Sequence, residues 1–480
     1  MKKIIFTLLC LILACGLLVG CDKKESDAPS ADLKYDIDVT LNGNTLTGKQ
    51  TVTFINVMKD GLSEAVFHLY PNAYAEEQEN KAYSGILPAY GGIEVTDISV
   101  GENAVTAQTD DSKQYLSVPL PSPAVGDKVT VKMSYTVTLP ECRLRLGKSG
   151  NCYLLSSFYP QLAVYEDGNY RRDLFTTVGD PLYSEIGEYD LTFTCPNNLV
   201  VASSGKTVSK TDEGETSSYV YHANNVRDFA LAASPDFDVL TARECDVDLY
   251  YFSIGDAAAN ERFSLVRSAF NKYTEAFGPS GLETFSVIIA PFDYSGMEFS
   301  GLVFVSSSAG DATEETLLHE TAHEWWYHLV GNDPIRQSAL DEGLTSFTSA
   351  YYYLLAGNEQ AFSQKIADVK KAYTQYETLQ KRRKTGVNLR LDGTIYDYTS
   401  YQYTMLMYYK ACMLFNNLYE LYGKDKTTAC LNAYATEYAH KTATFDGFIS
   451  VCNKELKTDV SGLVNGWLGD VSSIATFSQI

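Results

Sequence analysis

The segment Leu317–Trp326, with the sequence LLHETAHEWW, carries the most specific chemical signal in this chain of 480 residues. Side chains four residues apart lie on one face of a helix, so His319 and His323 can present two imidazoles to one ion. Glu320 follows the first histidine and can reach water beside the same ion. The pattern therefore predicts a helix that carries two ligands of a zinc site.

A catalytic zinc site needs a third protein ligand and one open position. Eighteen residues separate His323 from Glu342, which lies in the segment ALDEGL. A turn at residues 331–334 (GNDP) between two helices would bring Glu342 back beside the histidines. We expect His319, His323 and Glu342 to hold one Zn²⁺ per chain. The neighbouring Asp341 has two interpretations: it orients a ligating imidazole, or it is a solvated acid near a helix start.

The rest of the sequence predicts an α+β protein with two folded units. Apolar and polar residues alternate along residues 35–41, 129–139 and 189–193, a period that is typical of antiparallel strands with one buried face. After about Cys245 a few strands remain, and helical signals dominate from Ala312 onward. We predict a β-sandwich-like domain over residues 34–238 and a mainly helical catalytic domain over residues 239–480. Residues 402–422 are expected to form one helix that Gly423 ends.

The first twenty residues have the pattern of a signal peptide. Lys2 and Lys3 precede an apolar run, and the run ends in the sequence LVGC at residues 18–21. This ending resembles the lipobox of bacterial lipoproteins, in which the cysteine is acylated after cleavage; an uncleaved signal anchor is the alternative. Residues 21–33 are too polar to pack and predict a tether. We expect an extracytoplasmic lipoprotein, held at the bacterial cell membrane through an acylated Cys21.

Charge and cysteine content limit the partners and the kind of metal site. The formal net charge of −22 argues against nucleic acid as a partner. Seven of the ten cysteines lie beyond Cys21, and an odd number cannot pair completely. Cys142 and Cys152 flank a nine-residue stretch that could form a hairpin, so a local disulfide is one option. The cysteines beyond Cys21 contain no C-x-x-C pair, which disfavours a cysteine zinc site.

The arrangement HEXXH, eighteen residues and Glu resembles the aminopeptidase N and leukotriene hydrolase family of gluzincin metallopeptidases. Two further motifs occur in the family's order: Ser295–Phe299 (SGMEF) is similar to G-x-M-E-N, and Tyr408–Ala411 (YYKA) is similar to Y-E-K-G. The resemblance extends to the first domain, through residues 35–56, 67–72 and 225–230. It implies a thermolysin-like catalytic domain in a short bacterial lipoprotein form.

Site roles follow from this resemblance residue by residue. Glu320 would take a proton from the attacking water, and Tyr408 would stabilise the oxyanion, with Tyr409 as its competitor. The resemblance makes Glu298 the residue that receives the free α-amine of a peptide substrate. Gly296 and Met297 complete the substrate-binding motif, and Gly296 would let the substrate backbone approach an edge strand.

Several positions depart from the family pattern. Ser295, Phe299, Glu324 and Ala411 replace the family's usual Gly, Asn, Gln and Gly. None of them is a predicted metal ligand, so the departures affect amine recognition more than hydrolysis. The sequence ends at Ile480, without the large helical domain that follows in many relatives. The active site would then be more open, or a partner protein would cover it.

Together these features predict a lipid-anchored zinc aminopeptidase that trims peptides at the cell surface. A zinc endopeptidase that acts on longer peptides or on one dedicated partner is the first alternative. A non-catalytic surface lipoprotein that only binds is the second. The predicted ligands and the general base are all present, which favours an enzyme.

Overall fold

The structure is a computed structural model, and it describes residues 33–76, 82–83, 85–383 and 388–469. The predicted signal peptide over residues 1–20, the acylated Cys21 and nearly all of the tether lie outside these residues. Within the described ranges, every helix is too short or too polar to cross a membrane.

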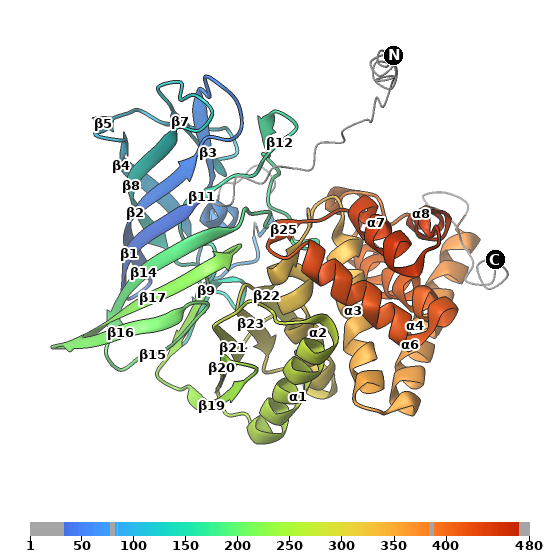
Figure 1. Cartoon of the computed structure of the whole chain (residues 1–480). Helices are drawn as coiled ribbons and strands as arrows, with labels where there is room; N and C mark the ends of the chain where they lie inside the picture. Colours follow the sequence, from blue (N-terminus) through green and yellow to red (C-terminus); the bar gives the residue numbers. More distant parts are fainter. Residues whose placement is uncertain (1–32, 77–81, 84, 384–387, 470–480) are drawn as a thin grey trace, which may run out of the picture.

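The first part of the chain is built on an eight-stranded sheet with the order β16-β17-β14-β1-β2-β8-β4-β5 (Figure 1). Along β1 the side chains of Tyr35, Ile37, Val39 and Leu41 are buried and the residues between them are exposed, as the alternation predicted. The bounds are β1 Lys34–Asn42, β2 Thr45–Ile55, β4 Gly92–Val100, β5 Asn103–Ala104, β8 Lys128–Thr138, β14 Gly187–Pro196, β16 Lys206–Glu213 and β17 Thr216–Val226.

One pairing in this sheet differs from the antiparallel prediction. β1 runs parallel to β14, while it runs antiparallel to β2. A parallel neighbour requires a long connection, and the chain makes several short strands before it returns as β14. The sheet is therefore mixed, although its other pairings are antiparallel.

Two four-stranded sheets, with the orders β15-β18-β10-β9 and β11-β3-β7-β6, and the hairpin β12-β13 complete the β-rich part. Their apolar side chains join those of the large sheet in one core, which gives the sandwich-like packing that the sequence predicted. The bounds are β3 Glu64–His68, β6 Gln108–Thr109, β7 Tyr115–Pro119, β9 Leu146–Ser149, β10 Cys152–Leu155, β11 Gln161–Leu162, β12 Tyr165–Glu166, β13 Asn169–Tyr170, β15 Val200–Ser203 and β18 Leu231–Ser234.

The local disulfide considered for Cys142 and Cys152 is absent, since both thiols are free. The register of the β9–β10 hairpin pairs Cys152 with Ser149. Cys142 lies outside the hairpin, beside Gly147, and its thiol donates to the carbonyl oxygen of Leu146 at 3.2 Å.

A five-stranded sheet with the order β19-β20-β21-β23-β22 joins the β-rich part to the helices. Along β21 and β23, Ile288 and Phe304 face the first core, while Val287 and Val303 face a second core formed with the helices. All seven residues of β21 are buried, as expected for a strand that is covered on both faces. The bounds are β19 Asp238–Glu244, β20 Val247–Ser253, β21 Thr284–Ala290, β22 Gly296–Phe299 and β23 Leu302–Ser306.

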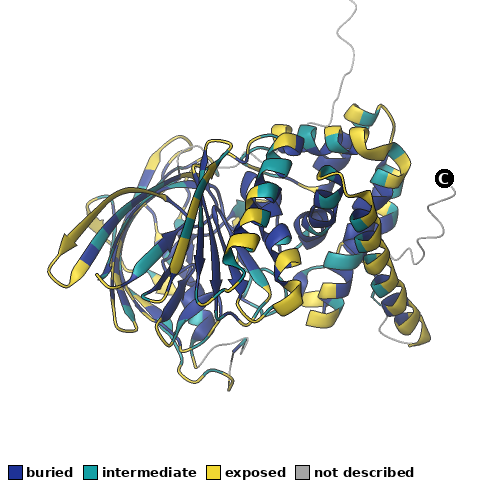
Figure 2. Cartoon of the chain, turned by 90° about the horizontal axis from the view of Figure 1, so that it is seen from below, coloured by how far each residue is buried: buried dark blue, intermediate teal, exposed yellow. Residues whose placement is uncertain are grey.

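Helices form the rest of the molecule, with buried side chains between them and exposed residues on their outer faces (Figure 2). The helices are α1 Ala259–Phe277, α2 Thr313–Ala322, α3 Ser338–Leu355, α4 Glu359–Arg382, α5 Ser400–Tyr403, α6 Ala411–Glu437, α7 Phe445–Leu456 and α8 Ser461–Leu468, and the short strands β24 Val330–Gly331 and β25 Lys441–Thr442 pair between them. Gly423 does break the helical backbone, with φ 77°, but a second helical stretch follows at once to Glu437. Gly423 therefore ends the first helical stretch, as the sequence predicted.

Candidate active site

The two histidines of the HEXXH segment lie at the end of α2, where the helix changes shape. α2 begins at Thr313 and ends at Ala322, and a π-helical segment, Glu324–Leu329, follows. His319 and His323 lie one turn apart, with their Nε2 atoms 3.2 Å from each other. The predicted helix and the shared face of its two imidazoles are present.

Glu342 lies in the first turns of α3, which packs beside α2. Its Oε2 is 3.2 Å from Nε2 of His319 and 3.6 Å from Nε2 of His323. The three side chains thus form a compact group of two nitrogen donors and one oxygen donor. The structure brings together the three residues that the spacing predicted as metal ligands.

The group fits a zinc ion both by donor type and by charge. Two imidazoles and one carboxylate are a common donor set of catalytic zinc. Around them lie the buried carboxylates of Glu298, Glu320 and Asp341. Oε2 of Glu320 is buried and has no hydrogen-bond partner among the described residues. A buried excess of negative charge with an unpaired oxygen is stabilised by a bound cation.

The orientation of His323 is fixed by the protein backbone. Its Nδ1 lies 3.0 Å from the carbonyl oxygen of Trp326, and the hydroxyl of Thr345 is 3.3 Å away. Such a partner on the second ring nitrogen selects the tautomer in which Nε2 is free to bind a metal. The carbonyl of Trp326 is available because the backbone there leaves helical geometry, at φ −108° and ψ 59°.

Asp341 takes neither of the two predicted positions. It is buried, so it is not a solvated acid, and its Oδ1 accepts a hydrogen bond from the backbone N–H of Glu342 at 2.7 Å. The acceptor that orients a ligating imidazole is therefore the Trp326 carbonyl, which no side-chain motif could indicate.

Glu320 points toward the edge strand β22 and packs against Gly296. A Cβ atom at Gly296 would lie 2.1 Å from Oε1 of Glu320. Gly296 thus leaves room for the carboxylate of Glu320, a reason different from the predicted approach of substrate backbone. Burial raises the pKa of Glu320 to about 8, and the charges of Glu342 and Asp180 act in the same direction.

The other residues of the SGMEF motif alternate between two faces of β22. Glu298 lies on the site face, with its Oε2 3.9 Å from Nε2 of His323, and burial raises its pKa well above the ordinary value. Met297 points to the opposite face and joins the core of the β-rich part. There its sulfur accepts a hydrogen bond from Nε of Arg145 at 2.7 Å. Met297 therefore supports the strand from behind and does not line the metal group.

Tyr408 reaches the metal group from a π-helical segment, Thr404–Lys410, that leads into α6. Its hydroxyl donates to Oε1 of Glu342 at 2.5 Å, and its ring centroid is 5.6 Å from that of His319. The pKa of its competitor Tyr409 is raised by burial and by Glu315 and Tyr401, which lie outside the metal group. The geometry places Tyr408, and not Tyr409, at the site.

Two charged residues of the β-rich part were missed by the sequence analysis. Arg145, at the start of β9, forms a buried ion pair with Asp180 and donates to the carbonyl oxygen of Gly179. The pKa of Asp180 is raised to about 6, mainly by burial; Arg145 opposes this increase and the Glu342 carboxylate adds to it. Asp180 therefore lies within electrostatic range of the metal group. The only sequence signal for this ion pair was that Arg145 stands between two leucines, Leu144 and Leu146.

Comparison with known proteins agrees with this geometry. Residues 282–467 match the model of the peptidase family M1 domain. Human aminopeptidase B is 26% identical over 210 residues, which are 40% of this chain and 31% of the human protein, so the match spans less than a third of that relative. An M1 zinc metallopeptidase from Deinococcus radiodurans, solved as a glutamate-to-alanine mutant, has a TM-score of 0.67 at 16% identity and covers 93% of this chain and 96% of its own. The same mutant protein bound to a Tyr-Ser-Ala substrate gives a TM-score of 0.66 at 15% identity, over 93% and 96% of the two chains.

The segment that matches peptidase family M1 contains the whole group of two histidines and one glutamate, which supports a zinc metallopeptidase. The match of residues 282–467 to the peptidase family M1 domain agrees with the resemblance to aminopeptidase N.

Proposed function

We propose that the protein is a zinc-dependent aminopeptidase that hydrolyses the N-terminal bond of peptides. The observation that carries the proposal is the position of Glu298, a buried carboxylate that lies 3.9 Å from His323 on the face of β22 that borders the metal group. A carboxyl group fixed there can bind the α-amine of a peptide, so that the first peptide bond lies beside the metal group.

His319, His323 and Glu342 would hold the zinc ion in this reaction. Zinc, when bound, polarises a carbonyl group and lowers the pKa of water. Glu320 accepts a proton from the attacking water and delivers it to the leaving amine, because its carboxylate lies beside the imidazole of His323 in the metal group. Tyr408 donates its hydroxyl hydrogen to the oxyanion that develops on the scissile carbonyl, after leaving its present acceptor on Glu342.

We also propose that the protein is held at the outer face of the cell membrane. This location is supported by the two lysines, the apolar run and the LVGC sequence that ends at Cys21. Peptides outside the cytoplasm would then be the substrates. Mass spectrometry of the N-terminal peptide, with and without lipase treatment, tests whether Cys21 carries lipid.

The catalytic part of the proposal is tested with peptides that have a free or an acetylated N-terminus. We expect cleavage of the first bond of the free peptides, loss of cleavage with a chelator or in Glu320→Gln, and no cleavage of acetylated peptides. Glu298→Gln should raise KM for free peptides more than it lowers kcat, because the charge that binds the amine is lost. Glu261→Gln, on the exposed side of α1, is the matched control.

Equal cleavage of acetylated and free peptides would reject the aminopeptidase and favour the endopeptidase alternative. In that case internal cleavage sites would appear in longer peptides. Bound zinc without hydrolysis of any peptide would instead favour a binding protein.

A further inference from the structure

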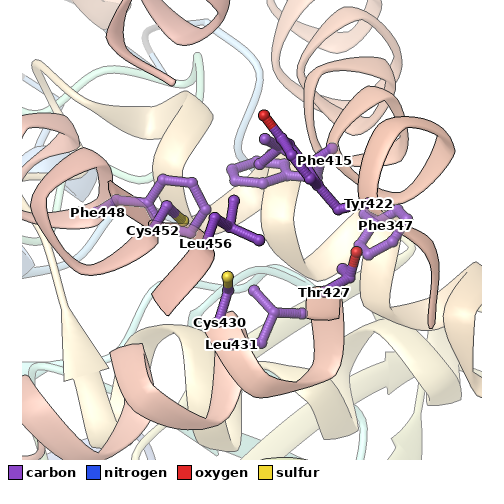
Figure 3. Close-up of a pocket in the computed structure, with 10 residues that line it drawn as sticks. Phe347, Phe415, Tyr422, Thr427, Cys430, Leu431, Phe448, Cys452 and Leu456 are labelled. Carbon is purple, nitrogen blue, oxygen red and sulfur yellow. The ribbon is translucent and has the colours of Figure 1, made fainter. Parts of the chain in front are cut away.

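Two buried cysteines, Cys430 on α6 and Cys452 on α7, line one small cavity between α3, α6 and α7. Cys430 is 5% exposed and Cys452 is fully buried. Figure 3 shows both side chains pointing into this cavity, from helices that pack against each other. The rest of the lining is mainly apolar, and Phe347 and Phe415 contribute to it.

The two thiols interact directly. A hydrogen bond from Cys452 lowers the pKa of Cys430, and the same contact raises the pKa of Cys452. Other described cysteines have different partners, such as the carbonyl oxygen of Leu146 for Cys142 and the side-chain oxygen of Asn271 for Cys245. Cys430 and Cys452 are thus a pair of free thiols from two helices, turned toward each other in an enclosed space.

We propose that Cys430 and Cys452 form a disulfide bond between α6 and α7 in an oxidising environment. The oxidant is a disulfide compound, either a protein or a small molecule such as oxidised glutathione. One cysteine, as thiolate, attacks the oxidant and releases one thiol; the other cysteine then displaces the second thiol. Two protons and two electrons leave the pair, and the oxidant's disulfide becomes two thiols. Because both cysteines are buried, the reaction accompanies the docking of α7 on α6 during folding.

The disulfide bond would stabilise the second half of α6, where the helix is interrupted. Gly423 separates the second half of α6, which carries Cys430, from the first half. The 21 residues between the cysteines contain β25, whose Lys441 carbonyl accepts a hydrogen bond from Arg227 at 2.8 Å. A cross-link around this loop restricts the unfolded chain and holds β25 against β24. It would hold α6 and α7 together without contacting the predicted metal ligands.

The test is peptide mapping of the full-length chain, refolded in the presence of either oxidised glutathione or a reductant and then alkylated under denaturing conditions. We expect a linked peptide pair that contains Cys430 and Cys452 in the oxidised sample, 2 Da lighter than the two reduced peptides together. Reduction should lower the Tm by about 5 °C, the scale expected when a disulfide that closes a loop of this size is lost from a large domain.

Cys430→Ser and Cys452→Ser should each abolish both the linked peptide and the redox dependence of the Tm. Cys412→Ser is the matched control, because Cys412 is also buried on α6, and it should keep both properties. Full alkylation of Cys430 and Cys452 in the oxidised native chain, or a link from either of them to another cysteine, would overturn the proposal. So would a redox-dependent Tm that survives in both serine variants.

Discussion

Tyr408 donates a hydrogen bond to Glu342, so the phenol proposed to stabilise the oxyanion is held by one of the three predicted metal ligands. The contact joins α3 to the π-helical segment before α6 and places the hydroxyl at the metal group. A hydroxyl in this position can pass from the carboxylate to a substrate oxygen with a small rotation of its side chain.

Tyr408→Phe should lower kcat by about 10²–10³-fold, the cost of removing one oxyanion donor, and should retain bound zinc. The ring remains to pack against His319, so the fold should be unchanged. Tyr409→Phe is the control, since its hydroxyl lies outside the metal group. Steady-state kinetics with zinc analysis of each variant measures the effect; equal losses in both variants would contradict the assignment of Tyr408.

Removal of the metal should abolish hydrolysis and lower the thermal stability. Without a cation, the carboxylates of Glu298, Glu320 and Glu342 remain buried close together, and their repulsion is less compensated. We expect a lower Tm after dialysis against a chelator, and recovery of both Tm and activity with about one equivalent of Zn²⁺ per chain. His323→Ala should not respond to zinc in either measurement. A Tm that is the same with and without zinc would count against a metal bound at this group.

Arg227 holds the β-rich part to the segment that follows the metal-binding helix. Its Nε donates to the carbonyl oxygen of Tyr327 at 2.7 Å. Burial raises the pKa of Asp228 to about 6 and that of Glu185 to about 7, and the charge of Arg227 opposes both increases. Arg227→Met should decrease the free energy of unfolding by about 3–5 kcal/mol, because the carbonyl oxygens of Tyr327 and Lys441 lose a charged donor and the buried interior loses a cation.

Urea unfolding of Arg227→Met measures this loss. Arg243→Met is the comparison, because Arg243 is exposed and pairs with Asp248 at the surface, where a salt bridge contributes about 0–1 kcal/mol. Similar losses of unfolding free energy in the two variants would show that the buried contacts of Arg227 stabilise the fold no more than a surface salt bridge does. A normal stability together with weaker zinc binding would assign Arg227 to the orientation of the Trp326 carbonyl instead.

His68 should make the fold less stable as the pH falls. Burial lowers the pKa of His68 to about 3, and the charge of Arg172 acts in the same direction. Between pH 6.5 and about 3 the unfolded chain binds a proton that the folded chain excludes, so this contribution to stability is lost as the pH falls through that window.

His68→Phe keeps a ring stacked on Tyr70, whose centroid lies 4.5 Å away, and removes the titration. Its unfolding free energy should therefore fall less between pH 7 and pH 4 than that of the native chain. Tyr70→Phe, which retains His68, should follow the native pH profile. Parallel profiles for all three chains would contradict the buried, neutral state of His68.

The sequence alone determined the parts of this protein that depend on local periodicity and on motif spacing. Alternating residues predicted the strands of the large sheet, and the spacing of His319, His323 and Glu342 predicted a group that does form. These predictions succeed because helix and strand geometry fix which side chains share a face, whatever the rest of the fold does. The SGMEF and YYKA motifs likewise indicated Glu298 and Tyr408, through a resemblance to a family.

Only the tertiary structure decided how distant segments complete the site. The carbonyl of Trp326 orients His323, Gly296 makes room for Glu320, and Asp180 approaches the metal group from the β-rich part. The parallel pairing of β1 with β14 and the shared cavity of Cys430 and Cys452 also depend on contacts between distant segments. Such contacts join residues far apart in the chain or involve backbone atoms that every residue carries. No local pattern encodes them, because they arise only when the packed sheets and helices fix the distances between segments.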